Sequence, residues 1–322
     1  MGNYLAASPK KEAVEKSLSN LYVSSRKKRS LRVKVIDVDL TNTKFIIFSD
    51  QHKGNRSGAD DFLACEKNYI AALKFYNSKA YSFINLGDSE ELWKFTAQQI
   101  IPANTECFTA EAAFQPKRYY KTFGNHDLIW KNKLDVNFFL KKNFQMPLPV
   151  YEGIVLRNKT NNIKLDIFLT HGHQGDLMSD NNVLSTWIVA HIWMPLQRYL
   201  RININSPSKD FSLCNAHNKM MYEWSSLQNN LLLITGHTHN PVFASGKYLD
   251  HPSNEIPGDK PATSLKPSYF NTGCCCFSDG DITGIEISDG YIRLVKWFGE
   301  EMQAKRKVLE EVDFAKLLGD LR

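Results

Sequence analysis

The sequence has no long apolar run, no cysteines at zinc-finger spacing and no strong excess of one charge. Its most membrane-like stretch, residues 187–200, is broken by His191, Pro195 and Arg198, so it falls short of the roughly 18 uninterrupted apolar residues of a membrane span. The N-terminal residues lack the apolar stretch of a secretory signal, and the six cysteines include no Cys-x-x-Cys pair. These absences argue against a transmembrane helix, an exported protein and a zinc finger, and they predict a cytoplasmic protein.

What the chain does contain is sufficient for a globular fold. It has 322 residues, of which 43% are hydrophobic and 12% aromatic, enough apolar surface to offset the conformational entropy lost on folding. At roughly 150 residues per domain, this length fits two domains or one large domain with an insertion. The net charge of +6 is a mild bias that favours anionic ligands, without the excess typical of nucleic-acid binders.

Stretches typical of strands alternate with helical patterns along most of the chain, which predicts an α/β fold. Residues 1–43 are predicted to form a basic arm and a first strand, residues 44–300 the main domain, and residues 301–322 a C-terminal helix. Residues 176–230 show no clear strand but two helical patterns rich in Trp, Met, Leu and Tyr, so we expect a helical cap inserted into the main domain. The predicted strands are residues 33–38, 45–49, 81–86, 119–123, 151–157, 164–169, 231–235, 282–287 and 291–297.

Residues able to bind metal follow five of these strands. Because sites in layered α/β proteins form where the carboxyl ends of strands meet, such residues can converge although they are far apart in sequence. Two carboxylates, one amide oxygen and four imidazoles are too many for one tetrahedral ion and fit two cations about 3.5–4 Å apart. Ligands of this kind without thiolate suit manganese, iron or zinc. The candidate ligands are Asp50, His52, Asp88, Asn125, His171, His237 and His239.

The order Asp-x-His, Gly-Asp, Gly-Asn-His-Asp, His-Gly-His and Gly-His-Thr-His over residues 50–239 resembles the calcineurin-like metallophosphoesterases. The resemblance implies a four-layer αββα sandwich of two mixed sheets, here with a helical cap. It implies two divalent transition-metal ions, with manganese favoured over iron or zinc. It also implies that His126 protonates the leaving group and that Glu91 orients His126. The ligands implied are Asp50, His52 and His239 for the first ion, Asn125, His171 and His237 for the second, and Asp88 for both.

The function implied is that of a metal-dependent phosphoesterase, which hydrolyses a phosphate ester or pyrophosphate bond by in-line attack of a metal-bridging hydroxide. Two divalent cations, two aspartates and one hydroxide leave a net positive centre that suits a phosphate oxyanion. Two alternatives stay open. One is a nuclease or phosphodiesterase of the same fold acting on nucleic acid or cyclic nucleotides, although nucleic acid is not favoured by the modest charge. The other is a non-catalytic, metal-stabilised scaffold, which would have no use for His126 as an acid.

A partial resemblance to the UDP-2,3-diacylglucosamine pyrophosphatases concerns the predicted cap. Those enzymes also have a helical insertion after the His-Gly block and a proline after Gly-His-Thr-His, as Pro241 here, but they carry Arg where this chain has His126. The expected substrate is therefore a phosphorylated small molecule or a lipid-linked phosphate, and peripheral membrane contact through the cap is a further expectation. Lys53 is a candidate for phosphate contact, and the cysteines at 274–276 are expected to pack in the interior.

Overall fold

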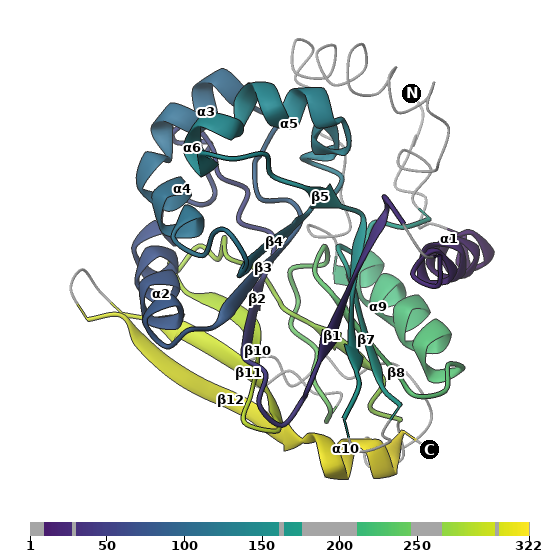
Figure 1. The fold of residues 1–322 in the computed structure, drawn as a ribbon. Coiled ribbons are helices and arrows are strands. Elements are labelled where there is room, and N and C mark those ends of the chain that lie inside the picture. Colours follow the sequence, from purple (N-terminus) through teal and green to yellow (C-terminus); the bar gives the residue numbers. More distant parts are fainter. Residues whose placement is uncertain are drawn as a thin grey trace.

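The computed structural model describes residues 10–27, 30–160, 164–175, 211–245, 266–299 and 303–321, and its strands form two sheets (Figure 1). The strands are β1 (Val33–Val38), β2 (Phe45–Phe48), β3 (Ser82–Leu86), β4 (Tyr119–Thr122), β5 (Val150–Tyr151), β6 (Gly153–Asn158), β7 (Asp166–Thr170), β8 (Leu231–Thr235), β9 (Tyr269–Asn271), β10 (Ile282–Ser288), β11 (Tyr291–Phe298) and β12 (Lys305–Asp313). One sheet has seven strands in the order β12-β11-β10-β2-β3-β4-β5, and the other has five in the order β1-β6-β7-β8-β9.

Both sheets mix parallel and antiparallel pairs. Strands β2 to β5 are parallel neighbours, whereas β10 to β12 extend that sheet by antiparallel pairing. In the other sheet β7, β8 and β9 are parallel neighbours, and β6 pairs antiparallel with β7. The central strands are buried along their whole length, as in the Phe-Ile-Ile-Phe of β2 and the Leu-Leu-Leu-Ile-Thr of β8. Continuous apolar runs of this kind are typical of strands covered on both faces.

Helices cover the two outer faces, which gives the four layers. The helices are α1 (Lys11–Ser24), α2 (Glu66–Ser78), α3 (Ala97–Ala103), α4 (Thr105–Ala112), the 3-10 helix η1 (Leu128–Lys131), α5 (Lys133–Phe139), α6 (Lys141–Phe144), α9 (Phe211–Ser226) and α10 (Phe314–Asp320). Helices α2 to α6 share one apolar core with the seven-stranded sheet, and α1 and α9 share another with the five-stranded sheet. Figure 1 shows α2 beside the first of these sheets and α9 beside the second.

Three apolar cores correspond to the three interfaces between these layers. The middle core joins side chains of both sheets, for example Ile47 and Ile84 from one and Ile167 and Leu232 from the other. The predicted sandwich of two mixed sheets is therefore confirmed. None of the helices that the structure describes combines the length and apolar content needed to cross a membrane.

The predicted C-terminal helix is wrong for most of its length. Lys305–Asp313 forms the strand β12 instead, and only the short α10 that follows is helical. The apolar residues of this segment, Val308, Leu309 and Val312, suit either structure, but the free edge of β11 offers backbone pairing from Tyr291 to Phe298. Pairing along a sheet edge outweighs the local helical pattern here.

The last part of the predicted cap belongs to the body of the domain. Helix α9 packs on α1, β8 and β9, and its Met221 and Trp224 lie in the same core as Val14 and Phe168. Residues 176–210, which make up the rest of the predicted insertion, lie outside the described residues.

Candidate metal centre

The candidate ligands lie at the carboxyl ends of strands from both sheets and converge on one rim of the sandwich. Three positions follow β2 and β3, one follows β4, and three follow β7 and β8. In that order the residues are Asp50, His52, Asp88, Asn125, His171, His237 and His239. The strand ends that carry these residues therefore come from both sheets.

The backbone at these positions is unusual. Asp50, His52, Asp88, His237 and His239 all have left-handed backbone angles, with φ between 49° and 71°. This conformation is uncommon for residues with a Cβ atom and is typically found where function or packing demands it. It turns each chain sharply as the strand ends, so that the side chains point into a common space.

Hydrogen bonds between the loops fix their relative positions. The backbone N–H of Asp50 donates to the carbonyl of Gly87 at 3.1 Å, and that of His52 donates to the carbonyl of Asp88 at 2.9 Å. Across the two sheets, the backbone N–H of His237 donates to Oδ2 of Asp50 at 2.9 Å. The same carboxylate oxygen accepts from the hydroxyl of Ser49. One oxygen of Asp50 is therefore used for structure, and Oδ1 is left for another role.

One group of donors surrounds Oδ1 of Asp50. This atom lies 3.3 Å from Nε2 of His239 and 3.8 Å from Nε2 of His52, and the two imidazole nitrogens are 3.0 Å apart. All three residues approach with atoms that can donate a lone pair. A small cation could be held among them.

A second group lies beside the first. Nε2 of His171 is 3.1 Å from Oδ2 of Asp88 and 3.9 Å from Oδ1 of Asp50, and a ligand atom of His237 lies within 4.8 Å of both His171 and Asp88. Oδ2 of Asp88 is also 3.8 Å from Nε2 of His52, so this carboxylate lies between the two groups.

The chemistry of these donors fits divalent cations. Oδ1 of Asp50, Oδ1 of Asn125 and Nε2 of His171 are buried atoms without a hydrogen-bond partner among the described residues. Leaving such atoms unsatisfied costs about 1–3 kcal/mol each, which a bound ion would offset. Burial would lower the pKa of His171, but the carboxylates of Asp88 and Asp50 raise it to about 9. The local field therefore favours positive charge at this place.

His126 and Glu91 lie next to the candidate ligands. Nδ1 of His126 is 2.8 Å from Oε1 of Glu91, and its ring stacks on Trp93 with centroids 3.8 Å apart. The other oxygen of Glu91 is 3.0 Å from Nδ1 of His52. Burial would raise the pKa of Glu91, yet the contacts with His126 and His52 hold it well below its usual range. One ionised carboxylate thus orients a candidate ligand and the candidate acid.

Asp127 supports the same loop from behind. Its side chain is buried and accepts hydrogen bonds from the backbone N–H groups of Gly124 at 2.6 Å and Ser89 at 2.9 Å. Burial raises its pKa to about 6, and the nearby carboxylates of Glu90 and Asp88 add to this while Lys121 opposes it. Asp127 therefore ties the loops after β3 and β4 together.

Lys53 does not face the site, so the expectation that it contacts phosphate is wrong. Its side chain is fully buried and its Nζ lies 2.5 Å from Glu111 and 3.3 Å from Glu90. Lys121 reaches the same Glu90 at 3.0 Å. Burial would lower the pKa of Lys53, but Glu111 and Glu90 raise it above its usual value. These charges form a buried network beneath the loops.

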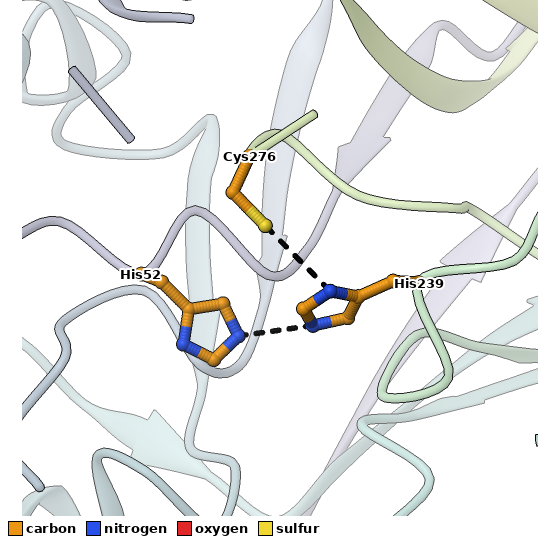
Figure 2. Close-up of side chains that lie close together, drawn as sticks. All are labelled: His52, His239 and Cys276. Carbon is orange, nitrogen blue, oxygen red and sulfur yellow. Dashed lines mark hydrogen bonds between the residues drawn. The ribbon is translucent and has the colours of Figure 1, made fainter. Parts of the chain in front are cut away.

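The sequence interpretation missed two side chains near the donors. Sγ of Cys276 lies 3.6 Å from Nδ1 of His239, although the cysteine run was expected only to pack in the interior (Figure 2). Nε2 of His217, on α9, lies 2.6 Å from the carbonyl oxygen of Gly172 beside His171. No local pattern pointed to either residue, because each reaches the site only through the pairing and packing of distant elements.

The protein is thus an α/β sandwich of two sheets. The loops at the ends of its strands carry two adjacent groups of candidate metal ligands, which could form a dinuclear centre. A sequence profile of the calcineurin-like phosphoesterases matches residues 43–241, more than half of the chain, and the chain belongs to that family.

No curated protein sequence matches the chain significantly. Among solved structures, the chain is similar to a single mutant of Vps29 from Entamoeba histolytica, with 14% identity, a TM-score of 0.34 and coverage of 84% of this chain and 99% of that one. Vacuolar protein sorting 29 from Cryptosporidium parvum gives 11% identity, a TM-score of 0.35 and coverage of 85% and 99%. A dimetal phosphatase from Danio rerio gives 7% identity, a TM-score of 0.45 and coverage of 84% and 98%.

Proposed function

We propose that this protein is a dinuclear metal-dependent phosphoesterase. The observation that carries the proposal is the set of buried lone-pair donors, Oδ1 of Asp50, Oδ1 of Asn125 and Nε2 of His171, that converge on one rim without hydrogen-bond partners among the described residues. Membership of the calcineurin-like phosphoesterase family supports the same conclusion.

We assign the donors to two cations according to the two groups. Asp50 and His239 surround the first position together with His52, and Asp88 lies between the two positions at 3.1 Å from His171 and 3.8 Å from His52. His237 and Asn125 complete the second position in this assignment. Imidazole, carboxylate and amide ligands favour manganese, with iron or zinc as the alternatives.

When bound, the two cations would polarise a phosphate group and lower the pKa of coordinated water. The chain itself would supply the proton that the leaving group takes up. Nδ1 of His126 is held by Glu91 at 2.8 Å, so Nε2 is the nitrogen left to donate to the leaving oxygen of a phosphate ester. Stacking on Trp93 fixes the plane of the ring. His126 is therefore the leaving-group acid and Glu91 the residue that positions it.

The substrate class that this site suits is a phosphate ester or a pyrophosphate, on a small molecule or a lipid-linked compound. We place the activity in a reducing compartment, the cytoplasm. The described cysteines Cys65, Cys107, Cys274, Cys275 and Cys276 are free thiols, and disulfides are the rule for proteins of oxidising compartments.

The test begins with protein stripped of metal by a chelator and then reloaded with manganese. We expect about two manganese ions per chain by elemental analysis, and hydrolysis of an aryl phosphate only after reloading. Panels of monoesters, diesters and pyrophosphates then define the bond that is cleaved. Chelator-stripped protein reloaded with magnesium in place of manganese, and His126→Ala loaded with manganese, serve as controls. Uptake of no more than trace manganese, or hydrolysis that is unaffected by the chelator, would refute the proposal.

A further inference from the structure

The two ring nitrogens of His239 face different groups, as Figure 2 shows together with His52 and Cys276. Nε2 faces the centre, 3.0 Å from Nε2 of His52 and 3.3 Å from Oδ1 of Asp50. Nδ1 faces Cys276 instead, 3.6 Å from its Sγ. The side chain of His239 is 22% exposed, whereas that of His52 is 5% exposed, so His239 lies nearer to solvent.

This geometry distinguishes two roles that Cys276 could have. His52, His239 and Cys276 carry potential ligand atoms within 4.8 Å of one another, which alone would allow a thiolate ligand. However, a cation beside Oδ1 of Asp50 would be bound by Nε2 of His239, whereas the sulfur contacts Nδ1, the other nitrogen of that ring. Cys276 therefore contacts the ligand and not the ion.

The position of the proton on an imidazole ligand decides which atom donates and which accepts in the contact between His239 and Cys276. A neutral histidine that binds a cation through Nε2 carries its proton on Nδ1 and needs an acceptor there. For His52 the partner of Nδ1 is the Glu91 carboxylate at 3.0 Å, and for His171 it is the carbonyl of Leu86 at 3.0 Å. For His239 the partner of Nδ1 is the sulfur of Cys276 at 3.6 Å, which is a weak acceptor.

We propose that Cys276 is a positioning residue for His239: its sulfur accepts the Nδ1–H of that ligand and thereby sets how firmly the first cation is bound. The assignment rests on the proposed metal-dependent function. The buried, unpartnered Oδ1 of Asp50, which lies 3.3 Å from Nε2 of the same imidazole, is the independent sign that a cation belongs there.

The same contact makes Cys276 a modification site that controls the centre. It is half-buried, while the other described cysteines, Cys65, Cys107, Cys274 and Cys275, are buried. Iodoacetamide would form a carbon–sulfur bond at Sγ, with iodide as the leaving group and the thiol proton passing to the buffer. The resulting thioether sulfur still carries lone pairs, but the added group would push against the His239 ring and displace it from the sulfur, so alkylated protein should bind the first cation poorly.

The experiment uses the full chain and cobalt(II) alone as the probe, with affinities measured by chelator competition and coordination followed by visible absorption. Cys276→Ala should weaken one of two cobalt sites by about tenfold, the lower end of the range for loss of a partner behind a metal ligand, and leave the other unchanged. Cys276→Asp should restore the affinity, because a carboxylate is a stronger acceptor. Cys276→Ser should not, because its shorter side chain leaves the hydroxyl too far from Nδ1.

Cys275→Ala is the matched control, since it removes a neighbouring thiol that points into the core; its cobalt affinities should equal those of the unchanged chain. Cys214, the remaining cysteine of the sequence, is replaced by serine so that it cannot react. In this Cys214→Ser background, iodoacetamide treatment of metal-free protein should reproduce the loss seen in Cys276→Ala. Equal two-site binding by Cys276→Ala and the unchanged chain would overturn the assignment. So would a sulfur-to-cobalt absorption band that disappears in Cys276→Ala, because it would make Cys276 a ligand. Failure of the unchanged chain to bind any cobalt would instead overturn the proposed function, and this assignment with it.

Discussion

The carboxylate of Glu91 contacts the imidazoles of both His126 and His52. Replacing Glu91 therefore tests its effect on metal binding, through His52, and its effect on proton transfer, through His126. Its oxygens lie 2.8 Å from Nδ1 of His126 and 3.0 Å from Nδ1 of His52. Glu91→Gln keeps the shape but provides only one acceptor, and its amide N–H₂ would face an Nδ1–H of the other ring. A hydrogen bond to a charged group contributes about 1.5–3 kcal/mol, which corresponds to about 10- to 150-fold in the property that depends on it.

The expected result depends on which ring loses its acceptor. Loss at His52 lowers manganese affinity, and loss at His126 lowers turnover at saturating manganese. His126→Ala should lower turnover of an alkyl phosphate by about 10²–10⁴ and that of a nitrophenyl phosphate by less, because a good leaving group needs little protonation. The decisive measurement is the turnover of the double variant that combines Glu91→Gln with His126→Ala. If Glu91 acts on turnover through His126, Glu91→Gln should cost nothing further in the His126→Ala background at saturating manganese. Independent, multiplicative losses would refute this reasoning.

Three further predictions concern the loops and their support. Asp88→Ala should lose both cations, because the carboxylate lies between the two groups of donors; elemental analysis that still found two manganese ions would contradict its shared role. Lys53→Met should lower the free energy of unfolding by about 3–5 kcal/mol in denaturant titrations, because Glu111 is left buried without its cation, and a loss below about 1 kcal/mol would show that the pair is dispensable. Gly124→Ala would place a methyl group against the Asp88 carboxylate and 2.7 Å from the His171 ring, so manganese affinity should fall by about 10–100-fold in protein that remains folded; unchanged affinity would mean that the loop can move aside.

Sequence patterns were sufficient for the parts of the site that are local in the chain. Each candidate ligand comes within a few residues of a strand end, and the carboxyl ends of strands meet in layered α/β proteins, so the α/β class and a common site for Asp50, His171 and His237 could be predicted from the pattern. The two mixed sheets were implied by the family resemblance. The Glu91–His126 contact was implied by the resemblance as well, and the structure has it at 2.8 Å.

Contacts between distant segments could not be predicted in the same way. Lys53 follows directly after a candidate ligand, yet its partner Glu111 comes from α4, which no local pattern linked to β2. Cys276 belongs to an apolar run and reaches His239 only because β9 pairs with β8. Lys305–Asp313 carries apolar residues that suit a helix as well as a strand, and the free edge of β11 decided between the two.

The distribution of the donors over both sheets also concerns mechanical stability. Asp50, His52 and Asp88 belong to loops of the seven-stranded sheet, and His171 and His239 to loops of the five-stranded sheet, so cations held as proposed would act as a clasp across the open end of the sandwich. The two sheets could then separate only after the cations had dissociated. A cation present at 100 times its dissociation constant would add about 2.7 kcal/mol to the free energy of unfolding, because it binds the folded chain and not the unfolded one. Chelation should therefore reduce the cooperativity of unfolding as well as its midpoint temperature.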